Sequence, residues 1–339
     1  MCGIGGVRRF GEEPIQKWQI QSLLLSNERR GNDATGVMLQ NEDEDAVYIW
    51  KMAKPASSAM QDDSFEEFLR EHLNERTSIA VVHTRAATSS DFRDNQNNHP
   101  LFRDDCAVVH NGIIMNHEWV FGKLEHQKPN CPTDSDVLRG LLDEYGLNET
   151  GMKSLNQLSG SVAMAAISKE RPGWLMLVKS GSPLSVGLTR GQLVFASEKE
   201  FVYDAVRPFV QRFGILARPL RPELAFTPMA NNSGWLIGPK GLEIRKEVTT
   251  TNYQRQEPDR SRYNSEFHKR RQRGSKSLTV VKSEVVKPLN AEETCFHCYK
   301  KIEIPEHLRW KTRAELECGE CGWYMNGSYR SKTGAGKVN

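Results

Sequence analysis

The sequence lacks any long hydrophobic run, and none approaches the ~18 residues that a membrane-spanning helix needs. Its first residues, 1–7, also lack the charged, apolar and cleavage regions of a secretory signal peptide. These absences argue against a helical membrane protein or a secreted one, and they predict a cytoplasmic protein. Apolar residues make up only 38% of the 339 residues, so we expect part of the chain to lie outside a packed core.

Cysteine is scarce, with seven residues in the whole chain. In a reducing compartment, cysteines are first interpreted as metal ligands or nucleophiles rather than as disulfide partners. The length also permits a sizeable core without cross-links, so the few cysteines point to chemistry or to metal binding.

The net charge is only +3, but it is unevenly distributed. Eight basic residues against three acidic ones give residues 254–276 a net charge of +5 and leave −2 on the rest of the chain. This region has no sustained apolar period, so residues 249–290 are predicted to form a flexible basic linker. Two interpretations remain open for it: a solvated spacer, or a contact with nucleic acid or another polyanion.

Before this linker, apolar runs with β-branched residues alternate with helix-like segments. Many predicted strands and few helices indicate an α+β fold, with helices packed on antiparallel sheets. Strands are predicted at 79–82, 106–109, 161–167 and 174–178, hairpins at 184–194 and 235–244, and helices at about 14–28 and directly after Thr133 or Asp134 as N-cap.

Cys2 is a candidate nucleophile because of its position. Initiator methionine is commonly removed before a small residue, which would make Cys2 the N-terminal residue. Its α-amino group would then have a reference pKa of ~7.7–8.0 and could take the thiol proton without a catalytic histidine. The glycines at 3, 5 and 6 allow close backbone approach. A cysteine at this position by chance is the alternative.

Polar clusters follow the predicted strands, where loops commonly carry function. Arg85 could hold a carboxylate through two hydrogen bonds. Asn111 and Gly112 could donate N–H groups to an oxyanion, and Asp134 could bind an ammonium group or simply cap a helix. Together with Cys2 these groups suit attack on the side-chain amide of a free amino acid.

Several ordered motifs resemble the class II, N-terminal-nucleophile glutamine amidotransferases, and most nearly the glutaminase domain of glucosamine-6-phosphate synthase. The resemblance covers about residues 1–248, and ordered matches over such a span are more specific than any single motif. The matching segments are CGIGG at 2–6, RGNDATG at 30–36, HTRAAT at 83–88, NHP at 98–100, VHNGII at 109–114, TDSD at 133–136, LSG at 158–160, SGSPL at 180–184 and ASE at 196–198.

The resemblance implies an αββα sandwich of the Ntn-hydrolase type and thiol catalysis by a glutaminase that needs no cofactor. Glutamine would form a glutamyl thioester on Cys2, releasing ammonia, and water would then release glutamate. The implied roles are Cys2 as nucleophile, Asn111 and Gly112 as oxyanion hole, Arg85 with Thr88 as α-carboxylate ligands, Asp134 and Gly112 as α-amino ligands, and Arg30 and Asp33 as supports of the nucleophile loop.

Two departures from the family pattern stand out. Ala86 replaces a tryptophan that usually helps to close the site and gate ammonia, and Asn32 replaces a common aromatic residue. Residues after 248 show no pattern of a sugar isomerase, a phosphoribosyltransferase or a nucleotide-dependent synthetase. The resemblance therefore implies that ammonia passes to an acceptor bound by a separate partner.

The C-terminal residues carry a CxxC…CxxC pattern with 19 residues between the two pairs. That spacing predicts a structural zinc ribbon at residues 291–339, in which four thiolates complete a closed tetrahedral site. The predicted Zn²⁺ ligands are Cys295, Cys298, Cys318 and Cys321. Basic and aromatic residues around them suit single-stranded nucleic acid, a protein partner or an ordinary surface.

Three hypotheses for the function follow from the sequence. The first is a glutamine amidotransferase that supplies ammonia to a partner, with nucleotide or nucleic-acid modification as one acceptor reaction. The second is a stand-alone amidohydrolase of the same fold. The third is a nucleic-acid-binding zinc ribbon with a vestigial amidotransferase domain, which the intact candidate set around Cys2 disfavours.

Overall fold

The computed structural model describes residues 1–87, 90–189, 191–206, 225–227 and 229–251, together with four short strands beyond residue 291. The chain divides into two units. The described residues up to Thr251 belong to the first unit, and the four short strands belong to the second.

The first unit contains a seven-stranded antiparallel sheet in the order β10-β8-β9-β1-β4-β2-β3. The strand β1, which begins directly after Cys2, lies near the middle of this sheet between β9 and β4. The strands are β1 Gly3–Arg9, β2 Ala34–Asn41, β3 Tyr48–Met52, β4 Thr77–Arg85, β8 Ser185–Leu188, β9 Gln192–Ala196 and β10 Ala225–Thr227.

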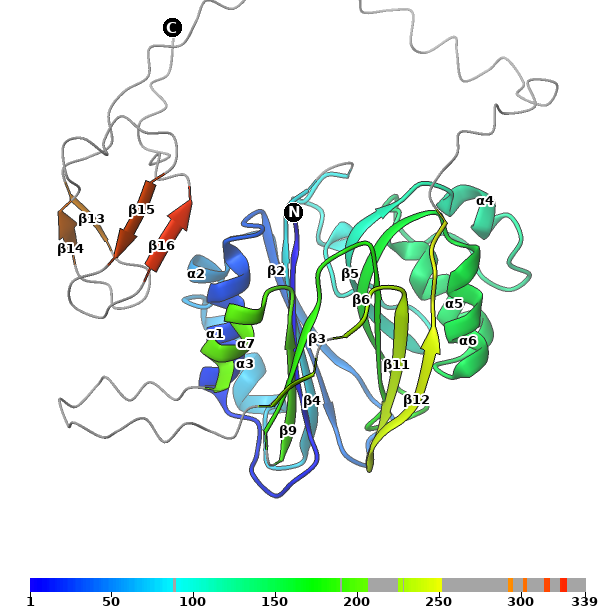
Figure 1. The fold of residues 1–339 in the computed structure, drawn as a ribbon, viewed down its shortest axis with the longest axis horizontal. Coiled ribbons are helices and arrows are strands. Elements are labelled where there is room, and N and C mark those ends of the chain that lie inside the picture. Colours follow the sequence, from blue (N-terminus) through cyan, green and yellow to red (C-terminus); the bar gives the residue numbers. More distant parts are fainter. Residues whose placement is uncertain are drawn as a thin grey trace, which may run out of the picture. The chain divides into compact units, whose positions relative to one another are not determined.

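A second antiparallel sheet has five strands in the order β12-β11-β7-β6-β5. It packs face to face against the first sheet (Figure 1). The strands are β5 Cys106–Ile114, β6 Gly160–Ser168, β7 Leu175–Ser180, β11 Ser233–Gly238 and β12 Gly241–Glu247.

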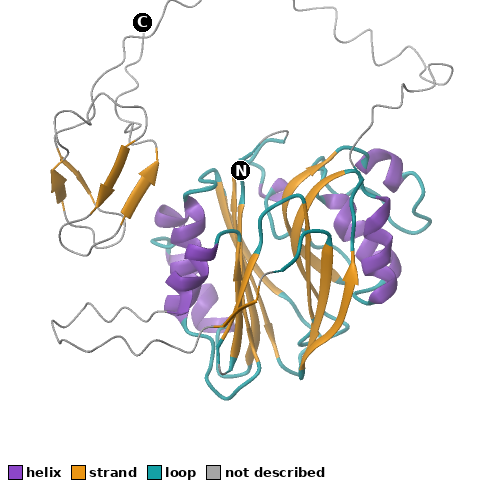
Figure 2. Cartoon of the chain, viewed as in Figure 1, coloured by secondary structure: helices purple, strands orange, loops and turns teal. Residues whose placement is uncertain are grey.

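Helices cover the outer face of each sheet (Figure 2). On the seven-stranded sheet lie α1 Lys17–Glu28, α2 Ala56–Ala59, α3 Asp63–His72 and α7 Lys199–Val206. On the five-stranded sheet lie α4 His117–Phe121, α5 Asp136–Tyr145 and α6 Glu149–Ser154. Short 3₁₀ turns occur at Asn95–Asn97 and Leu155–Gln157. The α+β sandwich expected from the sequence, with layers in the order αββα, is confirmed.

Burial on both faces of the sheets explains the continuous apolar runs in the sequence. Along β4, Ile79 and Val81 face the core between the two sheets, whereas Ala80 and Val82 face the helices. Successive strand residues point to opposite faces, so a strand buried on both sides needs apolar residues at every position. The strand β5 follows the same rule from Cys106 to Val109.

The helix ends and the motif positions differ from expectation in three ways. Helix α1 begins at Lys17 rather than Pro14, and the amide of Gln16 donates to Gln19 Oε1 (2.9 Å) at its start. Helix α5 begins after Ser135, so neither Thr133 nor Asp134 is its N-cap. The motifs at 83–85 and 110–112 were expected in loops but lie within β4 and β5, because the ladders extend past the apolar runs.

Threonines directly after β12 belong to the folded domain. Thr251 N donates to Leu158 O (3.1 Å) and Thr251 O accepts from Gly160 N (3.1 Å), so the domain extends past residue 248. The remainder of the predicted linker, 252–290, lies outside the described residues.

In the second unit, β13 Glu292–Thr294 pairs with β14 Lys301–Glu303, and β15 Ala314–Glu317 pairs with β16 Tyr324–Gly327. The four predicted zinc ligands lie outside the described residues.

A buried ion cluster on α5 holds the segment that precedes this helix. Arg139 Nε donates to Asp136 Oδ1 (2.6 Å) and Arg139 Nη1 to Asp143 Oδ2 (2.7 Å), and all three side chains are fully buried. Asp136 Oδ2 also accepts from the backbone N–H of Asn130 (2.5 Å). The cluster therefore fixes the approach to Asp134.

Arg139→Met should lower the free energy of unfolding by about 3–5 kcal/mol, because it leaves two buried carboxylates without their cation. Urea unfolding followed by circular dichroism measures this change. Lys153→Met is the control, since it removes the exposed Lys153–Glu149 pair (2.9 Å) and should cost at most about 1 kcal/mol. Equal losses of unfolding free energy in the two variants would contradict the claim that the buried ion cluster stabilises the domain more than an exposed ion pair does.

None of the helices in the described part of the chain is both long and apolar enough to cross a membrane.

Candidate active site

Cys2 lies at the entrance to β1, beside the end of β4. Its Sγ accepts from the backbone N–H of Ala86 at 3.3 Å, and the thiol faces the Ala86 carbonyl at 3.6 Å. Burial raises the pKa of the Cys2 thiol, while the Ala86 amide and the positive charges of the chain terminus, Arg85 and Arg30 oppose that rise. These groups would stabilise a thiolate at this position once a base removes its proton.

The carbonyl of Cys2 receives hydrogen bonds from the connection after α1 and from the second sheet. Arg30 Nε, after α1, donates to it at 2.8 Å, and so does Asn111 Nδ2, on β5, also at 2.8 Å. Arg30 also forms an ion pair with Glu198. Asn111 Nδ2 donates in addition to Ser197 Oγ (2.9 Å), which accepts from Ile4 N (2.9 Å). The structure thereby brings the sequence-predicted Cys2, Arg30 and Asn111 together.

Gly112 occupies a position that only glycine fits. Its φ of +143° is rare for other residues, and a Cβ there would lie 1.9 Å from the carbonyl oxygen of Ser161. Gly112 is exposed, in contrast to the buried Asn111 that precedes it. Its position next to Asn111 is compatible with a paired donor site.

Asp134 is held by the end of β5 rather than by helix α5. Its Oδ2 accepts from the backbone N–H of Ile114 at 2.7 Å, and Ser135 Oγ donates to Oδ1 at 3.4 Å. The carboxylate therefore lies beside the strand end that carries Gly112. This contact leaves the capping interpretation of Asp134 without support.

Arg85 is the last residue of β4 and is 5% exposed. Its Nη1 donates to Asn98 Oδ1 at 2.7 Å, and burial lowers the pKa of its guanidinium. Asp33 ties the same region together, because Asp33 N donates to Arg85 O (2.9 Å) and Asp33 Oδ2 accepts from Ala87 N (2.9 Å). Thr88, the other predicted carboxylate ligand, lies outside the described residues.

Three buried histidines lie near this end of the strands. Burial lowers the pKa of His83 to about 3 and holds those of His99 and His110 below the usual range. The rings of His83 and His99 are tilted by 40° with their centroids 4.3 Å apart, and His110 Nδ1 lies 2.8 Å from Ser135 Oγ. They are neutral at physiological pH, and among the described contacts none reaches Cys2 Sγ.

Sequence reasoning assigned no role to three residues that complete these contacts. Asn98 binds Arg85, Ser197 binds Asn111, and Glu198 binds Arg30. All three stand in segments of the sequence resemblance, 98–100 and 196–198. Their location in these matching segments was the only sign in the sequence that they have a role. Which residue each of them contacts could not be predicted, because the contacting residues are not neighbours in the sequence.

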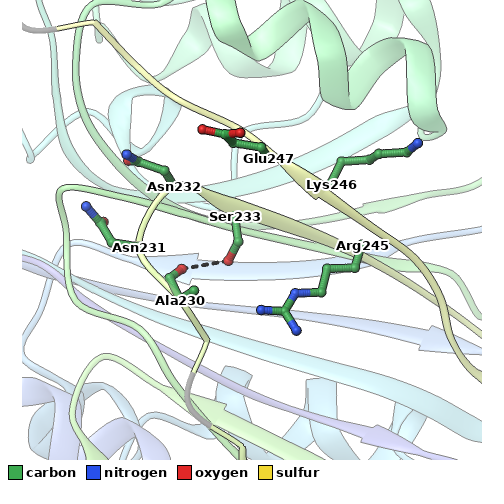
Figure 3. A pocket seen from close by; sticks show the side chains of 7 residues that line it. All are labelled: Ala230, Asn231, Asn232, Ser233, Arg245, Lys246 and Glu247. Atoms are coloured by element: carbon green, nitrogen blue, oxygen red, sulfur yellow. Dashed lines mark hydrogen bonds between the residues drawn. The ribbon is translucent and has the colours of Figure 1, made fainter.

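A surface pocket of about 310 Å³ lies at the β11–β12 end of the second sheet (Figure 3) and includes none of the predicted site residues. Ser233 Oγ donates to Ala230 O (2.6 Å) within its lining. Polar side chains dominate its lining: Asn231, Asn232, Arg245, Lys246 and Glu247. In the described part of the chain, no group of His, Cys, Asp and Glu side chains is arranged to hold a metal ion.

The αββα layers, with a cysteine at the entrance to a central strand of one sheet, define the fold of the N-terminal-nucleophile class. Residues 83–204 match the family model described as a glutamine amidotransferase domain. The chain thus contains a class II glutamine amidotransferase domain.

Curated relatives share this domain. The chain is 30% identical over 204 residues to glutamine–fructose-6-phosphate aminotransferase [isomerizing] of Thermotoga maritima, covering 58% of this chain and 32% of that protein. The protein of the same name from Agrobacterium fabrum is 31% identical over 208 residues, with the same coverage. That from Clostridium tetani is 30% identical over 260 residues, covering 73% of this chain and 38% of the relative. The chain therefore spans about a third of these relatives' length.

Solved structures share the fold at lower identity. Glutamine phosphoribosylpyrophosphate amidotransferase from B. subtilis, complexed with ADP and GMP, has a TM-score of 0.53 and 20% identity, covering 72% of this chain and 49% of that one. A structure described as the allosteric regulatory enzyme of purine biosynthesis has a TM-score of 0.55 and 20% identity, covering 72% and 48%. These likenesses support the Ntn-type sandwich.

Proposed function

We propose that this protein hydrolyses L-glutamine to glutamate and ammonia through a Cys2 thioester and passes the ammonia to an acceptor. The observation that carries the proposal is the convergence on Cys2 of an amide donor, Asn111 Nδ2, and of the nearby cation Arg85. A nucleophile, an oxyanion donor and a carboxylate-binding cation are the parts that hydrolysis of an amino-acid side-chain amide requires.

The first step is exposure of the α-amine of Cys2 by removal of Met1, which is 83% exposed. The freed amine takes the thiol proton, directly or through water. The Ala86 N–H and the charges of Arg85 and Arg30 stabilise the thiolate that results. Burial of the thiol opposes ionisation, so the base is needed for attack at neutral pH.

Thiolate attack on the δ-carbonyl of glutamine forms a C–S bond and a tetrahedral oxyanion. Asn111 Nδ2, by exchanging its bond to Cys2 O for one to the substrate, and Gly112 N are proposed to donate to this oxyanion. The ammonium form of the Cys2 amine returns its proton to the departing NH₂, so ammonia leaves and a glutamyl thioester remains. Water, deprotonated by the same amine, then cleaves the thioester and releases glutamate.

Recognition of the amino-acid end is assigned to groups on either side of this centre. Arg85, with Thr88, would bind the α-carboxylate, and Asp134, with the Gly112 carbonyl, would bind the α-ammonium group. Arg30 and Asp33 support the segments that carry Cys2 and Arg85 through the backbone bonds described above.

The acceptor is proposed to be bound by a separate partner. The matched region corresponds to about a third of the relatives' length, and the residues after 251 have their own composition, basic and cysteine-containing. We assign residues 1–248 to the amidotransferase domain, with Thr249–Thr251 packed on it, the following residues to a linker, and 291–339 to a partner-docking ribbon.

Incubation of the purified full-length chain with L-glutamine tests this function. Equal amounts of glutamate and ammonia are expected, and asparagine should be a poor substrate because its amide carbon lies one methylene closer to the α-groups. Release of glutamate and ammonia without any acceptor would also be compatible with a stand-alone hydrolase. A rise in rate on adding a co-purifying partner would distinguish the amidotransferase.

We further propose that the second unit holds one structural Zn²⁺. Two hairpins support this assignment, because Cys295 and Cys298 fall in sequence between β13 and β14, and Cys318 and Cys321 fall between β15 and β16. Each CxxC pair would thereby form one knuckle of a closed four-thiolate site.

Elemental analysis of the full-length chain should find about one zinc per molecule. Cys318→Ser should release the metal while leaving glutamine hydrolysis by the first unit unchanged. Cys106→Ser is the matched control, since Cys106 is a free buried cysteine of β5 and its loss should leave zinc content unchanged. A wild-type chain that folds without metal would contradict the ribbon.

A further inference from the structure

The guanidinium of Arg85 is a buried cation held only by neutral groups. Its Nη1 donates to Asn98 Oδ1 (2.7 Å), and its Nη2 donates to the carbonyl (3.3 Å) and the hydroxyl of Ser90. No carboxylate forms an ion pair with it in the part of the chain that the structure describes. Buried charges are ordinarily paired because desolvation is costly, so this cation is left for an anionic ligand.

The Asn98 side chain can present only its oxygen to Arg85. It is fully buried, and its Nδ2 donates to Phe92 O (2.7 Å) and Asn95 Oδ1 (2.9 Å). Its backbone carbonyl accepts from Lys51 Nζ (2.9 Å). Because both Nδ2 hydrogens are used, the amide cannot turn over without losing two bonds, and its orientation is determined by the fold.

We propose that Asn98 and Ser90 form a neutral cradle that orients Arg85 and leaves its charge unneutralised for the α-carboxylate of the substrate. Asn98 and Ser90 are thus positioning residues that determine specificity for a free amino acid. The inference rests on the proposed function, which supplies the carboxylate. It goes further because it explains how the site selects its substrate. Arg85 has no carboxylate partner among the described residues, so a substrate with a free α-carboxylate is preferred to one without it.

The charge of the cradle is tested by two substitutions of nearly equal size at one position. Ser90 is only partly buried, so Ser90→Asp adds a carboxylate beside Arg85 without removing Asn98. Ser90→Asn adds a neutral side chain of the same shape. Neutralisation should weaken carboxylate binding by about 10- to 100-fold, the contribution of a hydrogen bond between charged groups, whereas the neutral variant, in which an amide oxygen replaces the hydroxyl as acceptor, should weaken it clearly less.

Binding is measured by titration calorimetry on the full-length chain with L-glutamate and with L-isoglutamine, which differ only in the α-carboxylate. The wild-type protein and Ser90→Asn should prefer L-glutamate, and Ser90→Asp should lose that preference. With L-glutamine as substrate, Ser90→Asp should raise KM with kcat nearly unchanged, because the carboxylate is bound equally in the ground and transition states.

Asn98→Ala is the second variant and removes the main acceptor of Arg85. It should also raise KM, with the preference for L-glutamate reduced but not abolished, because the cation remains. Gln96→Glu is the charge control, since Gln96 is exposed in the same turn and its side chain makes no hydrogen bond to the part of the chain that the structure describes. It should bind both ligands as the wild-type protein does.

Identical behaviour of Ser90→Asp and Ser90→Asn, or a wild-type protein indifferent to the α-carboxylate, would overturn the cradle. Selective binding of L-glutamate without any release of ammonia from glutamine would instead refute the proposed function and leave the cradle standing. Ammonia release by the wild-type protein with an unchanged KM in Ser90→Asp would overturn the cradle and leave the proposed function standing.

Discussion

Cys2→Ala should lower the rate of glutamine hydrolysis by about 10⁴–10⁶-fold, the scale seen when an enzyme loses its nucleophile. Without the thiol no thioester forms, and the remaining donors stabilise only direct attack by water. The measurement is ammonia release from L-glutamine by the purified chain. Cys131→Ala is the control, because Cys131 is another free cysteine of the same domain and should retain nearly full activity.

Retention of Met1 should have an effect as large as removal of the thiol. A lysine inserted between Met1 and Cys2 blocks removal of the initiator, so the thiol stays in place but the α-amine of Cys2 becomes an amide. If the amine is the base, this chain is inactive although Cys2 is intact. Full activity of the inserted chain, verified by mass spectrometry of its N-terminus, would rule out the N-terminal-nucleophile mechanism.

The same mechanism predicts the direction of the pH dependence. The amine acts as a base only when neutral, so kcat/KM should rise with pH through its pKa, ~7.7–8.0 in reference peptides. The neutral His83, with its pKa lowered to about 3, cannot produce an inflection in this range. An activity independent of pH between about 6 and 8 would argue for another base.

Asn111→Leu is expected to lower kcat by about 10²–10³-fold, the usual loss for one oxyanion donor. The structure also predicts that the fold tolerates this change. Cys2 O keeps its bond from Arg30 Nε, and Ser197 Oγ keeps its bond from Ile4 N. KM should therefore change little, since the lost bond acts mainly in the transition state.

Asn116→Leu is the matched control for Asn111→Leu. It is the same chemical change five residues further along, and it removes the bonds that Asn116 makes with Gln157 O (2.9 Å) and Ser159 N (2.8 Å). Its expected signature is a lower free energy of unfolding with kcat nearly unchanged. If Asn111→Leu shows that signature instead, its amide supports structure rather than the oxyanion.

Much of the architecture was predictable because it depends on local patterns of residue type and spacing. The apolar runs at 79–82 and 106–109 predicted strands, and the punctuation at 190–191 and 239–241 predicted hairpins, all of which the structure contains. Local patterns failed at element ends. Whether β4 continues through Arg85 depends on pairing with Ala34 on β2, a partner that the local sequence does not specify.

Asp134 illustrates the same limit within the site. An aspartate before a helix is ordinarily an N-cap, and no local feature distinguishes it from one that bonds elsewhere. In the structure the Asp134 carboxylate instead accepts a hydrogen bond from the backbone N–H of Ile114, twenty positions away. Contacts at such separations have no period or spacing by which a single sequence reveals them.

By itself, the sequence determined the class of fold, the candidate nucleophile Cys2 and the polar motifs from which a site could be built. These features are local, because they depend on residue type, spacing and periodicity. Only the tertiary structure decided which of them meet. Asn111 reaches the carbonyl of Cys2 across 109 positions, and Arg85 rests on Asn98 rather than on a carboxylate. The close packing of two sheets makes these contacts, and it decides where charge is buried and left unpaired.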